Sequence, residues 1–231
     1  MLPFIIIIVL LLVGAIVYIV KHAPTERKKR KDYLQSLAYF FEGQLSLIPE
    51  HENSYRVNFF YRGYECLYED IELPGLRLGT ATYSGHLKIK TPSRVSLTFF
   101  ERARTQILSN SQTLDDVTNA RWGKPEGQVQ LPKVLTEFHA YTNNPEWANK
   151  FFNDQMVLKI FAAYKNRDSR GHPVMSLQIV EGVVDLEFHA PGDLKPSILV
   201  LEHNVTAAEP YLQELILIAE ALKRTDSEKS K

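Results

Sequence analysis

The apolar positions of the chain are most concentrated at its start. Residues 2–20, LPFIIIIVLLLVGAIVYIV, form nineteen consecutive positions without a charged side chain. As an α-helix this stretch would span about 28 Å, close to the ~30 Å hydrocarbon core of a bilayer. No basic residue precedes it, and Val20-Lys21-His22-Ala23 is a poor signal-peptidase site. The pattern therefore predicts an uncleaved transmembrane helix over residues 1–20.

A basic juxtamembrane linker over residues 21–32 follows the apolar stretch. The positive-inside rule places the chain beyond such a flank in the cytoplasm. We therefore expect a single-pass membrane protein with its N-terminus outside and its C-terminal body cytoplasmic. The linker acts as a topology signal in this interpretation; binding of anionic lipid headgroups is the alternative role. Its basic residues are Lys21, Arg27, Lys28, Lys29, Arg30 and Lys31.

The first part of the body mixes one helix with several strands. Helical spacing begins after Asp32 and stops at Gly43. Tyr55–Tyr61 and Tyr64–Leu73 are rich in aromatic and β-branched residues and predict a hairpin that turns at Arg62-Gly63. Alternating apolar and polar positions further on predict two or three more strands with one wet face. These elements define a first subdomain over residues 33–104.

A connector over residues 105–132, with many Asn, Ser, Gly and Pro residues, separates the two halves of the body. The second subdomain, 133–224, begins with a strand and continues with a helical region that Asn144 caps and Asp154 interrupts. Strands are expected on both sides of Glu181-Gly182 and again over residues 197–203.

The final helix has the clearest signals. Thr206 and Glu209 form a Thr-x-x-Glu capping box, and an apolar stripe follows it. The polar tail, 225–231, is predicted to be disordered. Together the patterns predict an α+β fold, with a mainly antiparallel sheet and packed helices divided between two subdomains.

Charge and cysteine content narrow the function classes. The 231 residues carry 27 basic and 27 acidic side chains, but six of the basic residues and only one acidic residue lie in 21–31. The remainder therefore has 21 basic and 26 acidic residues. A mildly acidic body does not attract nucleic acid. The single cysteine, Cys66, excludes an intrachain disulfide, and its position in a predicted strand favours a buried structural thiol.

The tetrapeptide Glu-Phe-His-Ala occurs twice, at Glu137 and at Glu187. In a half-buried strand, Phe and Ala would face the core while Glu and His face water. We favour this interpretation, which assigns no metal and no cofactor. If the two strands were neighbours, their side chains could instead form a zinc or iron site. The candidate ligands would be Glu137, His139, Glu187 and His189.

Other sequence motifs add little chemistry. The chain contains no phosphate-binding loop, dinucleotide fingerprint, GxSxG elbow or kinase signature. His86, in YSGHLKIK, lies at a predicted junction between a turn and a strand, where a solvated histidine is the expected role.

The order of elements resembles a group of bacterial membrane-anchored proteins to which no activity is assigned. The matching segments are the apolar span with its basic flank, LAYFFEGQL, VNFFYRGYECLYE, FHAYTNNPEWA, IVEGVVDLEF and the closing apolar helix. The resemblance implies a membrane-tethered α+β protein of the bacterial inner membrane. It implies no catalytic or binding residues.

These observations favour a non-catalytic interaction or assembly module, tethered to the membrane, that binds a protein or ligand near the inner-membrane surface. The crowding of aromatic residues in 33–104 suggests a protein-binding surface as well as a core. The alternative is a membrane-tethered, metal-dependent hydrolase that uses the Glu/His cluster of the two EFHA strands.

Overall fold

The computed structural model describes residues 7, 13–14, 27–74, 81–101, 127–166, 174–189 and 205–227. The predicted transmembrane helix lies almost wholly outside these residues, as do most of the connector and the strand predicted over 197–203. Within the described part of the chain, no helix has both the length and the apolar character needed to cross a membrane.

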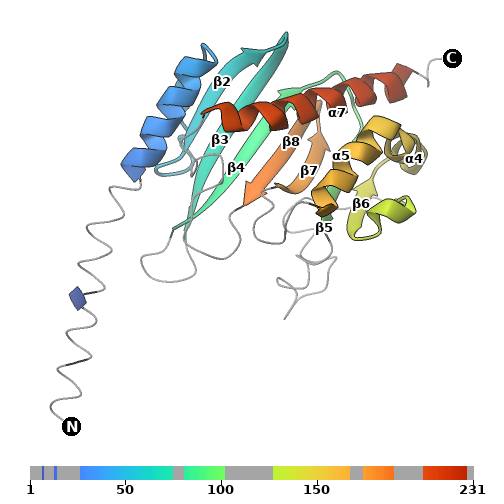
Figure 1. The fold of residues 1–231 in the computed structure, drawn as a ribbon, viewed down its shortest axis with the longest axis horizontal. Helices are drawn as coiled ribbons and strands as arrows, with labels where there is room; N and C mark the ends of the chain where they lie inside the picture. The colour runs from blue at the N-terminus through green and yellow to red at the C-terminus, as the bar shows by residue number, and fades with distance from the viewer. Residues whose placement is uncertain are drawn as a thin grey trace.

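The body is built on one antiparallel sheet of eight strands, in the order β1-β2-β3-β4-β8-β7-β5-β6 (Figure 1). Neighbouring strands β2 and β3 form the predicted hairpin, with Arg62 and Gly63 at positive φ in its turn. The strand bounds are β1 Gln44–Leu47, β2 Tyr55–Tyr61, β3 Tyr64–Pro74, β4 Ala81–Lys90, β5 Leu97–Glu101, β6 Phe138–Thr142, β7 Val174–Val180 and β8 Val183–His189.

Both halves of the sequence contribute to this one sheet. β4, from the predicted first subdomain, pairs with β8, from the predicted second subdomain, over seven residue pairs from Ser84↔His189 to Lys90↔Val183. β5 then pairs with both β6 and β7. The predicted boundary at 105–132 therefore corresponds to no break in the sheet, because long-range pairing joins the two segments edge to edge.

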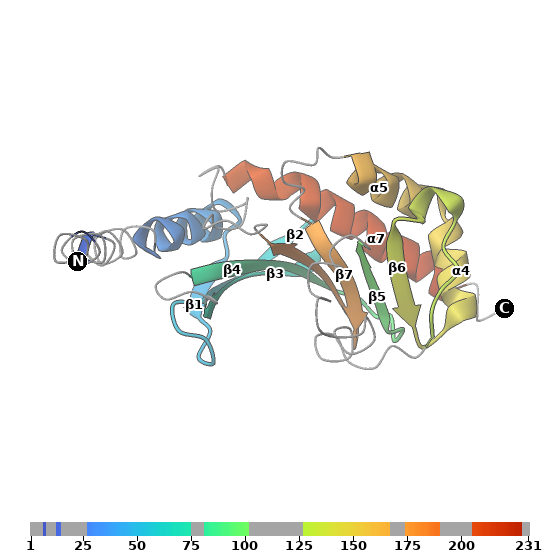
Figure 2. The same ribbon diagram turned by 90° about the horizontal axis from the view of Figure 1, so that it is seen from below.

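The described helices lie on one face of the curved sheet (Figure 2). This arrangement confirms the predicted α+β class with an antiparallel sheet and packed helices. The helical elements are an α-helix over 27–40, α4 Pro145–Asn153, α5 Gln155–Asn166 and α7 Glu209–Ser227, with short 3-10 turns at Lys133–Leu135 and Val205–Ala208.

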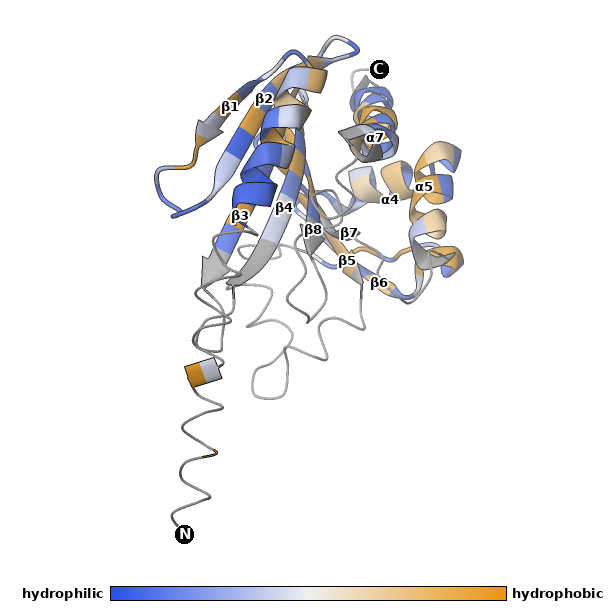
Figure 3. Cartoon of the chain, turned by 60° about the vertical axis from the view of Figure 1, so that its left-hand side comes forward, coloured by the Kyte–Doolittle hydropathy of each residue, from blue (hydrophilic) through white to orange (hydrophobic). Residues whose placement is uncertain are grey.

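A single apolar core fills the space between the helices and the sheet. Figure 3 shows apolar residues on the sides of α4, α5 and α7. Phe99 of β5 lies at the centre of one aromatic group, stacked on Phe138 and in contact with Phe161 of α5. At the other end, Phe41 stacks on Phe59 with ring centroids 4.7 Å apart. The predicted apolar stripe of α7 is buried in the same core.

Two helix boundaries follow the predicted signals. The Asn144 side chain accepts a hydrogen bond from the backbone N–H of Trp147, and Pro145 occupies the first turn of α4. Asp154 separates α4 from α5 and accepts hydrogen bonds from the backbone N–H groups of Met156 and Val157. A side-chain acceptor at each start satisfies amide groups that have no partner within the helix.

Three other boundaries differ from the prediction. The first helix is already formed at residue 27, so the segment 27–32 is helical rather than a linker. A 3-10 turn, Val205–Ala208, occupies the place of the expected capping box. α7 continues to Ser227, and the predicted disordered tail is ordered at Thr225 and Asp226 because Thr225 is buried and Asp226 binds Trp147.

Candidate functional site on the helix-free sheet face

The two EFHA segments lie on strands that are not neighbours. Phe138 to Ala140 belong to β6, whereas Glu187 to His189 belong to β8, and the strands β7 and β5 lie between them. With strands about 4.8 Å apart, the two segments are separated by roughly 14 Å of sheet. The convergence that a shared metal site requires is therefore not met. No group of at least three His, Cys, Asp or Glu side chains in the described residues could hold a metal ion.

Within each segment the expected strand alternation is present where the side chains are described. Phe138 and Ala140 are buried in the core, and His139 lies on the opposite side of β6. There His139 stands beside Phe100 and Tyr141. Glu187 is nearly buried, so it is not the water-facing carboxylate that alternation alone would suggest.

The sheet face without helices carries a ladder of charged side chains on four adjacent strands. β2 contributes Arg56, and the acidic residues of β3 and β8 enclose a basic row on β4. The sign of the charge is constant within each strand and alternates from strand to strand, so that opposite charges meet across the register. The members beyond Arg56 are Glu65 and Glu69 on β3, His86, Lys88 and Lys90 on β4, and Asp185 and Glu187 on β8.

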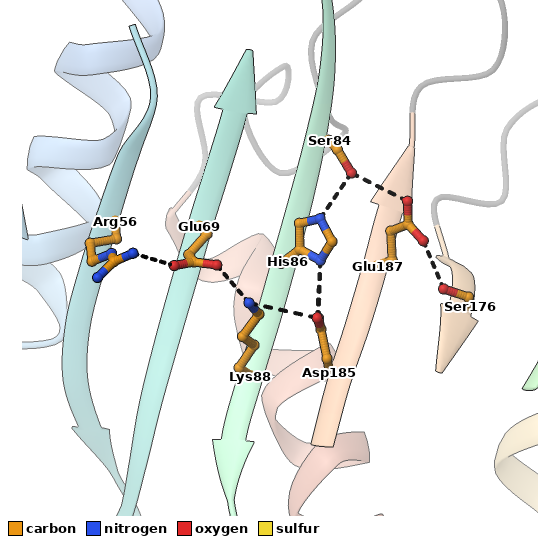
Figure 4. Close-up of polar contacts among 8 residues, drawn as sticks. All are labelled: Arg56, Glu69, Ser84, His86, Lys88, Ser176, Asp185 and Glu187. Atoms are coloured by element: carbon orange, nitrogen blue, oxygen red, sulfur yellow. Dashed lines mark hydrogen bonds and ion pairs between the residues drawn. The ribbon is translucent and has the colours of Figure 1, made fainter. Parts of the chain in front are cut away.

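Short contacts connect most of this charge ladder (Figure 4). The Glu69 carboxylate lies 3.0 Å from the Arg56 guanidinium and 2.6 Å from Lys88 Nζ. Lys88 Nζ is also 3.7 Å from Asp185 Oδ2. Lys90 Nζ lies 2.6 Å from Glu65 Oε1 at the exposed end of the ladder. Most charges of the ladder therefore have an opposite partner on a neighbouring strand, which stabilises the strand order and register.

His86 lies at the centre of the ladder, where the sequence suggested only a solvated ring. Its Nδ1 atom is 3.1 Å from Asp185 Oδ2, and its Nε2 atom is 3.1 Å from Ser84 Oγ. Burial disfavours the charged ring, but the hydrogen bond and negative charge of Asp185, with the charge of Glu187, raise the pKa of His86 above its usual value. The expectation was wrong because residue 86 lies in the middle of β4, between two strands with acidic residues.

Ser84, His86 and Asp185 have the connectivity of a Ser-His-Asp hydrolase triad. The serine, however, is almost fully buried, and its hydroxyl donates to Glu187 Oε1 at 3.4 Å. When the hydroxyl donates to Glu187, Nε2 of His86 donates to Ser84 Oγ, because a hydroxyl has one proton. The burial of Ser84 and its contact with Glu187 distinguish this arrangement from the accessible nucleophile of a hydrolase triad.

The series of hydrogen bonds through His86 and Ser84 ends at a buried carboxylate on β8. Glu187 accepts hydrogen bonds from Ser84 and, at 2.8 Å, from Ser176 Oγ on β7. Buried polar groups of this kind are stable only when their hydrogen bonds are satisfied. The sequence signal for this cluster is the charge of constant sign at alternate positions in β3, β4 and β8, which becomes informative once the strand order is known.

A shallow hollow of about 440 Å³ lies beside the charge ladder on the same face. The apolar side chains of Leu67, Val180 and Val183 contribute to its lining. Lys88 and Asp185 contribute opposite charges to the lining, so the hollow has no strong preference for anions or cations. Cys66 borders it but is a buried thiol whose pKa is raised to about 12, chiefly by burial, as its predicted structural role requires.

The basic segment divides into buried and exposed residues. Arg30 is 1% exposed and forms an ion pair with Asp70 of β3, so it is not available to lipid headgroups. Arg27 is partly exposed and binds Glu72 at 2.6 Å. Lys28, Lys29 and Lys31 are exposed. Lys21 lies outside the described residues.

Large apolar side chains are exposed around the β1 edge of the sheet. Tyr39 and Phe40, at the end of the 27–40 helix, are 88% and 44% exposed. Leu47 on β1 is 63% exposed and Phe60 on β2 is 73% exposed. We call Tyr39, Phe40, Leu47 and Phe60 the corner residues. Aromatic side chains with this exposure are typical of protein-binding surfaces.

Comparison with known proteins identifies no family. No family model matches the chain, and no curated protein matches its sequence. Among solved structures, the chain is similar to the mycobacterial trehalose monomycolate transport factor A, TtfA, with a TM-score of 0.46. The identity is 10%, over 85% of this chain and 94% of that chain. At this TM-score the likeness supports no conclusion about fold or function.

Proposed function

We propose that this protein is a non-catalytic interaction module, tethered to a bacterial inner membrane by its N-terminal segment, with its body in the cytoplasm. Its partner is a protein that binds the corner residues. The observation that carries the proposal is the exposure of Tyr39, Phe40, Leu47 and Phe60 on three adjoining elements at the β1 edge, with Leu47 on the helix side of the sheet and Phe60 on the other side. The exposure of such side chains to water is unfavourable, and their burial by a partner lowers the free energy.

The charge ladder supports a structural role for the helix-free face of the sheet. Its ions and hydroxyl groups bind one another across strands, and Ser84 is buried against Glu187. We therefore assign to the charge ladder the role of fixing the strand order. We assign the binding of a partner to the corner residues.

The position of the corner residues fits a protein rather than a lipid partner. A helix over 27–40 is about 20 Å long. Its basic end, with Lys28, Lys29 and Lys31, adjoins the N-terminal segment, whereas Tyr39 and Phe40 lie at its other end. The lysines are placed to approach anionic headgroups. The aromatic residues at the other end of the helix are placed to bind a partner that lies away from the bilayer surface.

The test is cross-linking in cells that make the protein, followed by co-purification of the full-length chain from native membranes and mass spectrometry. The test variant carries Tyr39→Ser and Phe60→Ser; the matched control is Met156→Ser, which removes an exposed apolar side chain from α5. The proposal predicts a near-stoichiometric partner that the control retains and the test variant loses. Equal recovery from both variants, or the absence of any partner, would contradict it.

A further inference from the structure

The two edge strands of the sheet differ in whether another segment of the chain pairs with their outer side. At β6, the segment 127–129 pairs with the outer edge: Val129 N–H donates to Ala140 O, and Thr142 N–H donates to Gly127 O, both at 2.9 Å. At the opposite edge, β1 pairs with β2 on one side, and no described strand pairs with its other side. The sheet therefore presents one edge that its own chain covers and one that remains available among the described residues.

The backbone of β1 shows which groups face outward. Ile48 N–H donates to Ser54 O at 3.0 Å, and this pair continues the register Leu47↔Tyr55 by one residue. In an antiparallel ladder, hydrogen-bonded pairs alternate with non-bonded pairs. Ser46 and Gln44 therefore bond to β2, whereas the N–H and C=O groups of Leu45 and Leu47 point away from the sheet.

The side chains of β1 do not protect this edge. Gln44-Leu45-Ser46-Leu47 contains no charge and no proline, which are common means of blocking further strand pairing. Leu45 and Leu47 face the helix side, and Leu45 packs against the core, while Gln44 and Ser46 face the other side. An added strand would find an apolar row on one face and a small polar row on the other.

We propose that β1 is a docking strand, and that an extended segment of a partner protein adds to the sheet beside it. This inference rests on the proposed function and specifies the mode of binding. The segment would alternate apolar residues, placed beside Leu45 and Leu47, with small polar residues, placed beside Gln44 and Ser46. Its backbone would bond to the outward groups of Leu45 and Leu47.

A second copy of the chain fits this edge less well. Two β1 strands related by a closed two-fold axis pair antiparallel, which turns one copy by half a turn in the plane of the sheet. The 27–40 helix runs alongside the strands (Figure 1), so the start of this helix at residue 27 would point in opposite directions in the two copies. With the proposed membrane tether, both starts could not face one bilayer, whereas a strand from another protein meets no such restriction.

The test uses the full-length protein in its native membranes, with a benzophenone side chain at Gln44, an exposed position on β1. Leu45→Pro removes an outward N–H group and leaves the bonds to β2 intact. Leu45→Ala is the matched control, because it shortens the side chain but keeps that N–H, and Leu45 is not one of the corner residues. Loss of one backbone hydrogen bond plus the steric effect of the ring predicts a fall in cross-link yield of about fivefold or more.

The expected result is one cross-linked partner protein, retained in Leu45→Ala and lost in Leu45→Pro. Should Leu45→Pro fail to fold, as judged by thermal unfolding, Ser46→Lys replaces it, since a charge at an edge strand opposes strand addition. No cross-link, equal yields in the two variants, or a product of two identical chains would overturn the inference. A partner that survives Leu45→Pro but is lost with Tyr39→Ser and Phe60→Ser would overturn strand addition and leave the proposed function standing.

Discussion

The guanidinium of Arg30 and the carboxylate of Asp70 form a buried ion pair that ties the 27–40 helix to β3. Their side chains are 2% and 0% exposed, and both Nε and an Nη atom of Arg30 donate to Asp70 Oδ2. A third contact joins Arg30 to Glu72 at 3.4 Å. The ion pair thus holds the 27–40 helix, which follows the proposed membrane tether, in a fixed orientation to the sheet.

Replacing only one member of this pair should strongly destabilise the protein. Arg30→Met leaves the Asp70 carboxylate buried without its cation, which typically costs about 3–5 kcal/mol. Urea unfolding followed by circular dichroism measures the change in free energy of unfolding. Lys28→Met is the control, since it removes an exposed charge from the same helix and should change stability by less than about 0.5 kcal/mol.

The double variant Arg30→Met, Asp70→Leu separates charge burial from packing. Replacing a whole buried ion pair with apolar residues is often close to neutral, so the double variant should recover most of the lost stability. A double variant as unstable as Arg30→Met would show that the uncompensated carboxylate is not the cause.

His86 should make stability depend on pH near and above neutrality. The partners Asp185 and Glu187 raise its pKa in the folded protein above the unfolded value of about 6.5. Its contribution to stability is therefore fully present below about pH 6.5 and is lost as pH rises through the folded pKa. The other groups facing the ring are Ser84 and Lys88, and Lys88 opposes the upward shift.

An NMR titration of the His86 ring, together with unfolding curves from pH 6 to 9, tests this prediction. His86→Gln keeps a polar side chain but cannot carry the charge, so its stability should fall less over this pH range. A ring that titrates below 6.5 would contradict the upward shift of the His86 pKa.

Local elements were predictable because their signals are local. The hairpin of β2 and β3 follows from aromatic and β-branched residues around Arg62-Gly63, and the start of α4 follows from Asn144-Pro145. The early start of the first helix was missed because a run of Lys and Arg suggested solvent. Nothing beside Arg30 in the sequence indicates that Asp70, forty residues away, would bury it.

The strand order was not predictable from local pattern. β4 and β8 are about a hundred residues apart in sequence, and their pairing joins segments that the connector appeared to separate. The same limitation made the EFHA segments look like possible neighbours, although β7 and β5 lie between them. The charges on β3, β4 and β8 do indicate the strand order, but only when the charges of one strand are compared with those of another.

Cys66 should be inert in the folded protein. Burial raises the pKa of its thiol to about 12, so the reactive thiolate is scarce at neutral pH, and the side chain is also shielded from reagents. A thiol reagent at pH 8 should leave the native protein unmodified under conditions that fully modify it in urea. Rapid native labelling would show that the core around β3 opens.

The indole of Trp147 should make the end of α7 important for stability. Its Nε1–H donates to Asp226 Oδ1 at 2.7 Å, and Trp147 is 1% exposed. Asp226→Ala leaves a largely buried donor without this partner and should cost about 1–3 kcal/mol in unfolding free energy. Glu220→Ala, at an exposed position of the same helix, is the control and should have little effect. Equal stability of the two variants would show that Asp226 does not contribute to the fold, as the prediction of a disordered tail implies.

The central claim, that a protein partner covers the corner residues, is tested most directly by thiol accessibility. Because Cys66 is buried, a cysteine introduced by Ser36→Cys, one turn before Tyr39 and Phe40, is the reporter, and Lys159→Cys on α5 is the control. Maleimide labelling rates are compared between native membranes and purified protein. The account predicts that Ser36→Cys is labelled more slowly in membranes while Lys159→Cys is labelled equally in both; equal rates for Ser36→Cys as well would contradict it.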